Sequence, residues 1–167
     1  YLDDPAAVGR IAQLTQKTNQ FNLTTKRYTE ADVQHLISSE KSSVWSFRLV
    51  DRFGDNGIIA VVIVHTGDEG WELDTFLMSC RVMGRGVETA ILSVIVEAAK
   101  AAEVKRLKGR YVPTAKNGLA REFYASYGFR GMNRCDEGEE WMLDLPDGEI
   151  TPPAWCKIEF RKVEPDI

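Results

Sequence analysis

The stretch from Trp71 to Ala102 holds a strand, a glycine-containing turn and an amphipathic helix in direct succession. Trp71 to Cys80 has the length of a strand and follows a turn at residues 67–70. Apolar residues then recur at the i, i+3 and i+4 spacing of a helix from Gly86 to Ala102; they are Val87, Ala90, Ile91, Val94, Ile95 and Ala98. A strand that runs into such a helix packs the helix on a sheet, which indicates an α/β domain.

Two more strands come before this unit. Val44 to Asp51 and Ile58 to His65 are separated by Gly54-Asp55-Asn56-Gly57, a strong turn sequence. With the strand that ends at Cys80 they predict an antiparallel meander over residues 44–80.

The remaining elements complete a mixed α/β order. Asp32 lies three residues after Thr29, which predicts a capping box at the start of the second helix. We expect helices at 5–17, 29–39 and 117–127, strands at 105–112 and 140–145, and one further extended piece at 156–160. The predicted architecture is therefore a mixed, mostly antiparallel sheet with helices on both faces.

Length and composition set limits on the class of protein. The 167 residues fit one domain, with a core at about 5–145 and a tail at 146–167. The chain begins at Tyr1 without an initiator Met, so we expect an excised domain that has lost an N-terminal partner. A net charge of −4 argues against nucleic-acid binding, and no apolar run is long enough to cross a membrane. Three scattered cysteines favour the cytoplasm, and two histidines without ligand spacing predict no metal site.

The turn after the central strand has the composition of an anion-binding loop. It reads Arg81, Val82, Met83, Gly84, Arg85 and Gly86, and it ends where the long helix begins. Small residues at such a junction let backbone amides face an anion at the positive end of the helix dipole. The alternative is that the two glycines only make the turn.

A second set of residues gives this loop a family context. RxxGxG, followed by Asn117, Phe123-Tyr124 and Gly128-Phe129, resembles the signature of the GNAT (N-acetyltransferase-like) superfamily over about residues 5–145. The resemblance implies the GNAT fold and a coenzyme A or phosphopantetheine cofactor whose pyrophosphate lies on the loop. It also implies that Asn117 meets the pantetheine arm and that Tyr124 lies beside the thioester and protonates the leaving thiolate.

Four longer blocks resemble one branch of proteins more closely. Residues 10–25, 51–57, 78–85 and 111–117 are similar to the C-terminal half of the FkbH-like proteins. That resemblance implies transfer of a glyceryl unit from a small phosphorylated donor to an acyl carrier protein, within a protein that also has a haloacid-dehalogenase-type domain. That second domain, with its phosphatase activity and magnesium, is not part of this sequence.

Four residues are candidates for catalysis. Cys80, next to Arg81 and the helix N-terminus, is a candidate nucleophile, and the alternative is a packing role. In a regular strand it shares a face with Asp74, a candidate general base or substrate-orienting group. His65 ends the preceding strand and is a candidate base beside Cys80, although a histidine at a strand end is often incidental. Tyr124 is the candidate general acid, with packing as the alternative.

The loop between the first two helices is the candidate acyl-group site. Asn19, Gln20, Asn22 and Thr24 offer amides and a hydroxyl suited to a neutral hydroxylated substrate; alternatively, the loop satisfies its own backbone. Three functions remain open: glyceryl-type transfer to a carrier-protein thiol, conventional acetyl transfer from acetyl-CoA to an amine, and non-catalytic docking of CoA or carrier protein.

Overall fold

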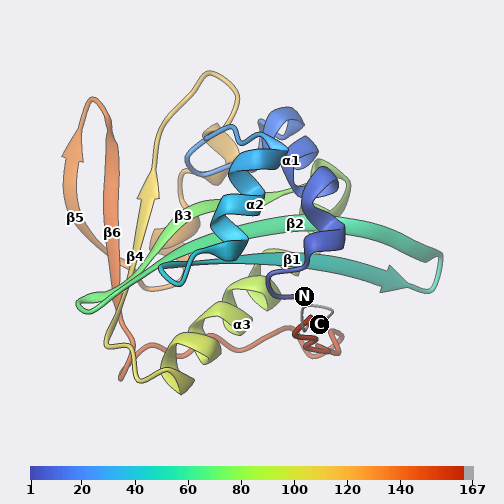
Figure 1. The fold of residues 1–167 in the computed structure, drawn as a ribbon. Helices are drawn as coiled ribbons and strands as arrows, with labels where there is room; N and C mark the ends of the chain where they lie inside the picture. The colour runs from blue at the N-terminus through green and yellow to red at the C-terminus, as the bar shows by residue number, and fades with distance from the viewer. Residues whose placement is uncertain (164–167) are drawn as a thin grey trace.

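The computed structural model describes residues 1–163, which form one layered α/β unit (Figure 1). Its centre is a six-stranded sheet in the order β1-β2-β3-β4-β6-β5. The strands are β1 Ser42–Asp51, β2 Gly54–Gly67, β3 Gly70–Met78, β4 Arg106–Tyr111, β5 Arg130–Cys135 and β6 Gly138–Asp144. All neighbouring pairs are antiparallel except β3 and β4, which are parallel. The mostly antiparallel mixed sheet predicted from the sequence is confirmed.

Helices cover both faces of the sheet. On one face lie α1 Val8–Lys17 and α2 Glu30–Ser38, and on the other lie α3 Val87–Ala101 and the short α4 Phe123–Ser126. Three 3₁₀ turns add to these, at Pro5–Ala7 (η1), Cys80–Val82 (η2) and Gly118–Ala120 (η3). Alternate residues of β2 feed the two cores: Val61 and Ile63 pack under α1 and α2, and Val62 and Val64 pack under α3.

The capping box at α2 is present as predicted. The Thr29 side chain accepts from the Asp32 amide, and the Asp32 carboxylate accepts from the Thr29 amide at 2.8 Å. This reciprocal pair fixes where α2 begins, and with it the C-terminal end of the loop between α1 and α2.

The prediction missed one strand and was wrong about two other segments. β5 has no counterpart in the prediction, because every one of its residues is exposed and no apolar alternation marks it. The helix expected over 117–127 is broken into η3 and the four-residue α4. Residues 156–160 form no strand; the tail instead runs past α3 and β1 to the N-terminus, where the Leu2 amide donates to Arg161 O.

The parallel pair β3 and β4 opens partway along its length. Pairing covers only Trp71 with Leu107, Glu72 with Lys108, and Leu73 with Gly109. Beyond these pairs both strands continue, β3 to Met78 and β4 to Tyr111, without bonding to each other. The sheet therefore has a gap between its two central strands on the side toward the 81–86 loop.

No helix in the described part of the chain is both long and apolar enough to span a membrane.

Candidate functional site

The gap between β3 and β4 is filled by part of the loop between α1 and α2. The Leu23 amide donates to Phe76 O at 3.1 Å, and the Met78 amide donates to Phe21 O at 3.0 Å. On the opposite side, the amide of Val112, just past β4, donates to Leu23 O at 2.8 Å. Residues 21–23, called here the inserted segment, therefore pair like a short strand with the free edge of β3.

Asn117 fastens the inserted segment in place. Its side-chain amide donates to Asn22 O at 3.0 Å and to Val112 O at 2.9 Å, and its oxygen accepts from the Thr114 amide at 2.8 Å. The side chain is fully buried and fully hydrogen-bonded. The residue that was expected to meet a pantetheine arm thus holds the chain's own backbone where the arm was expected.

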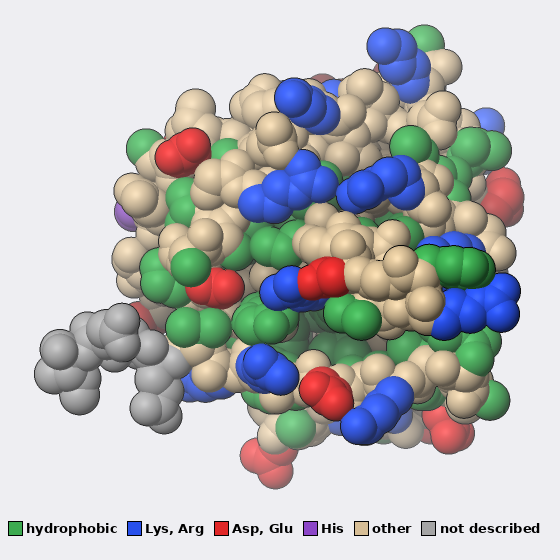
Figure 2. Space-filling view, turned by 90° about the vertical axis from the view of Figure 1, so that its right-hand side faces the viewer, with side chains coloured by type: hydrophobic (Ala, Val, Ile, Leu, Met, Phe, Trp, Pro, Cys, Tyr) green, Lys and Arg blue, Asp and Glu red, His purple; other side chains and the backbone are tan. Residues whose placement is uncertain are grey.

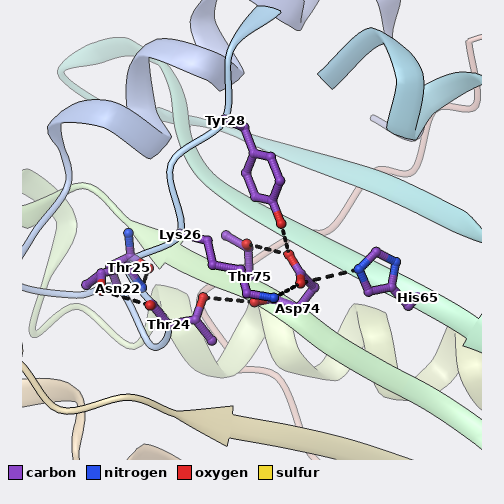
Figure 3. Close-up of polar contacts among 8 residues, drawn as sticks. All are labelled: Asn22, Thr24, Thr25, Lys26, Tyr28, His65, Asp74 and Thr75. Carbon is purple, nitrogen blue, oxygen red and sulfur yellow. Dashed lines mark hydrogen bonds and ion pairs between the residues drawn. The ribbon is translucent and has the colours of Figure 1, made fainter. Parts of the chain in front are cut away.

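Asp74 is the centre of a polar cluster beside the inserted segment (Figure 3). Its buried carboxylate forms an ion pair with Lys26 and accepts hydrogen bonds from the Tyr28 hydroxyl at 2.5 Å and the Thr75 hydroxyl at 3.0 Å. His65 Nε2 lies 3.3 Å from the same carboxylate. Burial alone would raise the pKa of Asp74, but the hydrogen bonds from Lys26 and Tyr28 outweigh it and hold the pKa below its ordinary value.

A β-bulge places Asp74 in this cluster. Leu73 pairs with Val64, and Thr75 pairs with the preceding residue, Ile63, so Asp74 is the extra residue of its strand. The bulge breaks the alternation of faces that the prediction for Asp74 and Cys80 assumed, and Cys80 itself lies outside the strand, in η2, so that prediction was wrong. Phe76 and Met78 pack in the α3 core, whereas Asp74 bonds to Tyr28 beside α1 and α2.

Four of the predicted site residues meet here. Asp74 and His65 are in contact, the Thr24 hydroxyl donates to Asp74 O at 2.8 Å, and Asn22 lies in the inserted segment. Asn19 and Gln20 lie outside the cluster; the Asn19 oxygen accepts from Arg27 instead.

Sequence reasoning missed Lys26 and Tyr28, which follow Thr24 in the same loop. The only sequence signal for them is that they directly follow residues 10–25, one of the four blocks that resemble the FkbH-like proteins. No spacing rule connects a loop to a bulge fifty residues later.

Cys80 and His65 are not neighbours, contrary to prediction. His65 pairs with Glu72 near one end of β3, whereas Cys80 lies beyond the other end, in η2. At the rise of a strand the two are roughly 20 Å or more apart. Cys80 is an exposed free thiol at the start of the 81–86 loop. The structure thus separates the polar cluster at Asp74 from a thiol at the start of the 81–86 loop, called below the anion loop.

The 81–86 loop has the backbone shape of an anion site. Gly84 and Gly86 have φ values of 75° and 74°, in the left-handed region, and Gly86 is the N-cap of α3. Val82 is buried and anchors the loop, and Met83 is half-buried. Among residues 1–163, no backbone carbonyl accepts a hydrogen bond of normal geometry from the amides of residues 84–89, which surround the N-terminus of α3, a position of the kind that binds anions.

Tyr124 lies under the point where β3 and β4 separate. Its ring packs against Gly109 so closely that a Cβ at this glycine would come within 2.2 Å of Tyr124 Cζ. The hydroxyl is buried; the Arg110 backbone amide lies near it without the geometry of a normal hydrogen bond, and no other partner is present among the described residues. Burial raises the pKa of Tyr124 well above its ordinary value, so the hydroxyl keeps its proton at physiological pH.

Solved structures share this arrangement of strands and helices. Ribosomal-protein-S18-alanine N-acetyltransferase from Escherichia coli superposes with a TM-score of 0.62 at 16% identity, over 85% of this chain and 90% of that one. A Desulfovibrio desulfuricans protein described as an acetyltransferase of the GNAT family has a TM-score of 0.62 at 14% identity, over 85% and 92%. The chain has the GNAT fold.

A third neighbour with the GNAT fold was solved with a ligand. Rv2747 from Mycobacterium tuberculosis, in complex with CoA and NLQ, has a TM-score of 0.62 at 13% identity, over 84% of this chain and 95% of that one. No protein-family model matches the chain, and no curated protein sequence matches it. The comparisons therefore establish the fold.

Within this GNAT fold, the residues present fit one end of CoA better than the other. The amides of residues 84–89 and the left-handed Gly84 and Gly86 suit a pyrophosphate. The pantetheine arm would need the free edge of β3, which the inserted segment holds. Over residues 1–163, no group of three or more His, Cys, Asp or Glu side chains is placed to hold a metal ion.

Proposed function

We propose that this domain is an acyltransferase that works on a phosphopantetheine thioester at the gap between β3 and β4. The buried, unpartnered hydroxyl of Tyr124 is the observation that carries this proposal. A buried hydroxyl without a partner costs free energy, so it points to a group that is hydrogen-bonded only when substrate is present. Its position beneath Gly109 puts it where an arm lying between the strands would end.

The anion loop would fix the other end of the arm. The amides of residues 84–89 bind the phosphate groups, and the arm runs from there along β3 toward Tyr124. To do so it replaces the inserted segment, which frees Phe76 O and the Met78 amide to pair with the amides of pantetheine. These backbone groups are well suited to an extended ligand because they are already aligned as a strand edge.

Two groups would handle the protons of the transfer. As the C–S bond of the thioester breaks, the Tyr124 hydroxyl, which is protonated at physiological pH, gives its proton to the leaving thiolate. On the side of α1 and α2, His65 takes the proton of the attacking thiol or amine. Asp74 binds Nε2 of His65 and so orients the ring, which leaves Nδ1 for the acceptor.

For the acyl group and its acceptor, we propose a glyceryl-type unit and the thiol of an acyl carrier protein. Support comes from the resemblance to the FkbH-like proteins and from the hydroxyls of Thr24 and Thr25 beside the Asp74 cluster. A small-molecule acyl donor and a haloacid-dehalogenase-type domain would belong to the complete system and would act before this step, by loading the acyl group as a thioester on the arm in the gap. The carrier-protein thiol then attacks that thioester, a new C–S bond forms, and the arm's thiolate leaves. Acetyl transfer from acetyl-CoA to an amine is the alternative that uses the same geometry.

Calorimetric titration with CoA tests the binding part of this proposal. We expect the 167-residue chain to bind CoA, and Gly84→Asp or Gly86→Asp to weaken binding at least tenfold, because a carboxylate would then face the anion. Gly128→Asp is the matched control, since Gly128 is exposed, has a φ of 79° like Gly84 and Gly86, and lies after α4 rather than in the loop. No binding at millimolar CoA, or equal binding by all variants, would refute the proposed site.

Cys80 supports a second candidate, a covalent route. Its exposed thiol lies at the start of η2, directly before Arg81 and the anion loop. If Cys80 carries the acyl group, incubation with a thioester donor adds the acyl mass to the Cys80 peptide, and hydroxylamine removes it. Full transfer activity of Cys80→Ala would exclude this route and leave direct transfer through Tyr124. CoA binding without transfer to any acceptor would favour a docking module.

A further inference from the structure

The hairpin of β1 and β2 extends past the end of β3 and lies against the anion loop (Figure 1). Arg81 of the loop donates to Asn56 O at 3.5 Å, and Arg85 forms an ion pair with Asp51 at 2.8 Å. Residues 48–58, called here the hairpin tip, therefore form one continuous surface with the loop. Any molecule whose phosphate group sits on the loop must also face this tip.

This surface is rich in arginine, although the chain as a whole has a net charge of −4. Arg10 joins it, because its guanidinium reaches Ile58 O at 3.5 Å. Figure 2 views this end of the molecule, where Lys and Arg side chains are spread across the face and Asp and Glu side chains lie between some of them. The charged residues that the contacts place on this surface are five arginines and two aspartates: Arg10, Arg48, Arg52, Arg81, Arg85, Asp51 and Asp55.

Apolar side chains project from the same tip. Phe53 is 82% exposed and Val50 is 67% exposed, the two most exposed large apolar residues of the hairpin. The Arg52 guanidinium lies over the Phe53 ring at 4.5 Å from its centroid. An exposed aromatic ring flanked by arginines has the composition of a protein interface rather than of ordinary solvent-facing surface.

We propose that the hairpin tip docks an acidic protein that carries a phosphopantetheine arm. This inference rests on the proposed function, because it takes the anion loop as the place where the arm's phosphate binds. In such a substrate the phosphate joins the arm to the carrier, so the carrier's surface lies directly beside the loop and against Arg52 and Phe53. The excess of arginine then complements the acidic residues of the carrier and speeds the encounter.

Free CoA gives the control that separates docking from binding of the arm. Its phosphates reach the loop, but it has no protein surface to place on Phe53. Among residues 1–163, the one hydrogen bond at these two positions runs from the Phe53 amide to the Asp51 carboxylate, and a side-chain change leaves it intact. No ion pair of Arg52 is present in this part of the chain, and its guanidinium lies over the Phe53 ring. Changes at these two positions therefore affect the carrier and spare CoA.

The experiment measures the affinity of the 167-residue chain for a holo acyl carrier protein, for the same carrier without its arm, and for CoA. Variants Arg52→Glu and Phe53→Ala are compared with Lys105→Glu, an exposed position beyond the far end of α3. We expect Arg52→Glu and Phe53→Ala to weaken holo-carrier binding by about tenfold, with CoA affinity within twofold of wild type. Lys105→Glu should change neither, and raising the salt concentration should weaken the carrier complex more than the CoA complex.

Each result decides one of the two claims. Holo-carrier affinity that is unchanged in Arg52→Glu and Phe53→Ala, while CoA still binds, overturns the docking surface and leaves the proposed function standing. If neither CoA nor the holo carrier binds to wild type, the proposed function itself is wrong. Equal losses in Lys105→Glu would mean that net charge alone drives the association, which also overturns the docking surface.

Discussion

The carboxylate of Asp74 binds the Lys26 ammonium group and the hydroxyls of Tyr28 and Thr75. A single substitution measures how much these contacts stabilise the fold. Asp74→Asn removes the charge that Lys26 and Tyr28 face, so we expect a loss of about 2 kcal/mol in the free energy of unfolding at pH 7. Asp136→Asn, on an exposed turn, should cost nothing measurable. Chemical denaturation of both variants checks this, and equal stability of wild type and Asp74→Asn would mean that the cluster does not stabilise the fold.

The same residue predicts a pH dependence with a definite sign. The pKa of Asp74 is lower in the folded chain than its ordinary value, so its contribution to stability is present above about pH 4 and is lost as the pH falls through the folded value. The difference in unfolding free energy between wild type and Asp74→Asn should therefore shrink below about pH 4. A difference that grows on acidification would contradict a lowered pKa.

Tyr124 lies in α4 and Tyr127 is the C-cap of the same helix, so substitutions of the two tyrosines can be compared directly. Tyr124 lacks a hydrogen-bond partner among residues 1–163, whereas the Tyr127 hydroxyl is 2.5 Å from that of Thr89. Tyr124→Phe should leave stability within about 0.5 kcal/mol and lower the transfer rate by about a hundredfold. Tyr127→Phe should cost about 1 kcal/mol and leave the rate unchanged. Acyl-transfer assays measure the rate, and chemical denaturation measures the free energy of unfolding. The reverse pattern would show that Tyr124 is not the general acid.

At the scale of elements, the close packing of β4 on α4 sets the position of Tyr124. Gly109→Ala would place a methyl group 2.2 Å from Tyr124 Cζ, so we expect about 2–3 kcal/mol of destabilisation and weaker CoA binding. Gly118→Ala meets no atom within 4 Å and serves as the control. Thermal unfolding of the two variants checks this; tolerance of Gly109→Ala would show that Tyr124 can move aside.

The elements with strong local signals were predictable from the sequence. The i, i+3, i+4 pattern of α3 and the capping box at Thr29 each depend on neighbouring residues, and each is present. The β1–β2 hairpin is also present, but the turn predicted at 54–57 was wrong: Gly54 pairs with Asp51, so the chain turns at Arg52 and Phe53 and residues 54–57 belong to β2. β5 was missed because its side chains all face solvent. The bulge at Asp74 and the insertion of residues 21–23 were missed for another reason. The bulge is a register shift between β2 and β3, and the insertion pairs residues 21–23 with Phe76 and Met78, more than fifty residues later; no local pattern encodes either pairing.

At the scale of the whole molecule, the GNAT fold holds three regions on which the proposals rest. The arginine-rich hairpin tip and the anion loop lie at one end, Tyr124 lies beneath the gap, and the Asp74 cluster lies on the side of α1 and α2. The inserted segment occupies the path between them. Leu23 is fully buried and Phe21 nearly so, and exposing each side chain to solvent would cost about 2 kcal/mol. Because CoA has to displace both residues in order to bind, we expect its affinity to be weak.

Amide hydrogen exchange followed by NMR tests most directly whether a pantetheine arm replaces the inserted segment. The amides to follow are Leu23 and Val112, which are bonded across the gap, with Val62 of β2 as an internal reference. We predict that saturating CoA makes the Leu23 and Val112 amides exchange at least tenfold faster and leaves Val62 unchanged. CoA that binds while Leu23 and Val112 stay as protected as before would contradict this, because the arm would then lie outside the gap between β3 and β4.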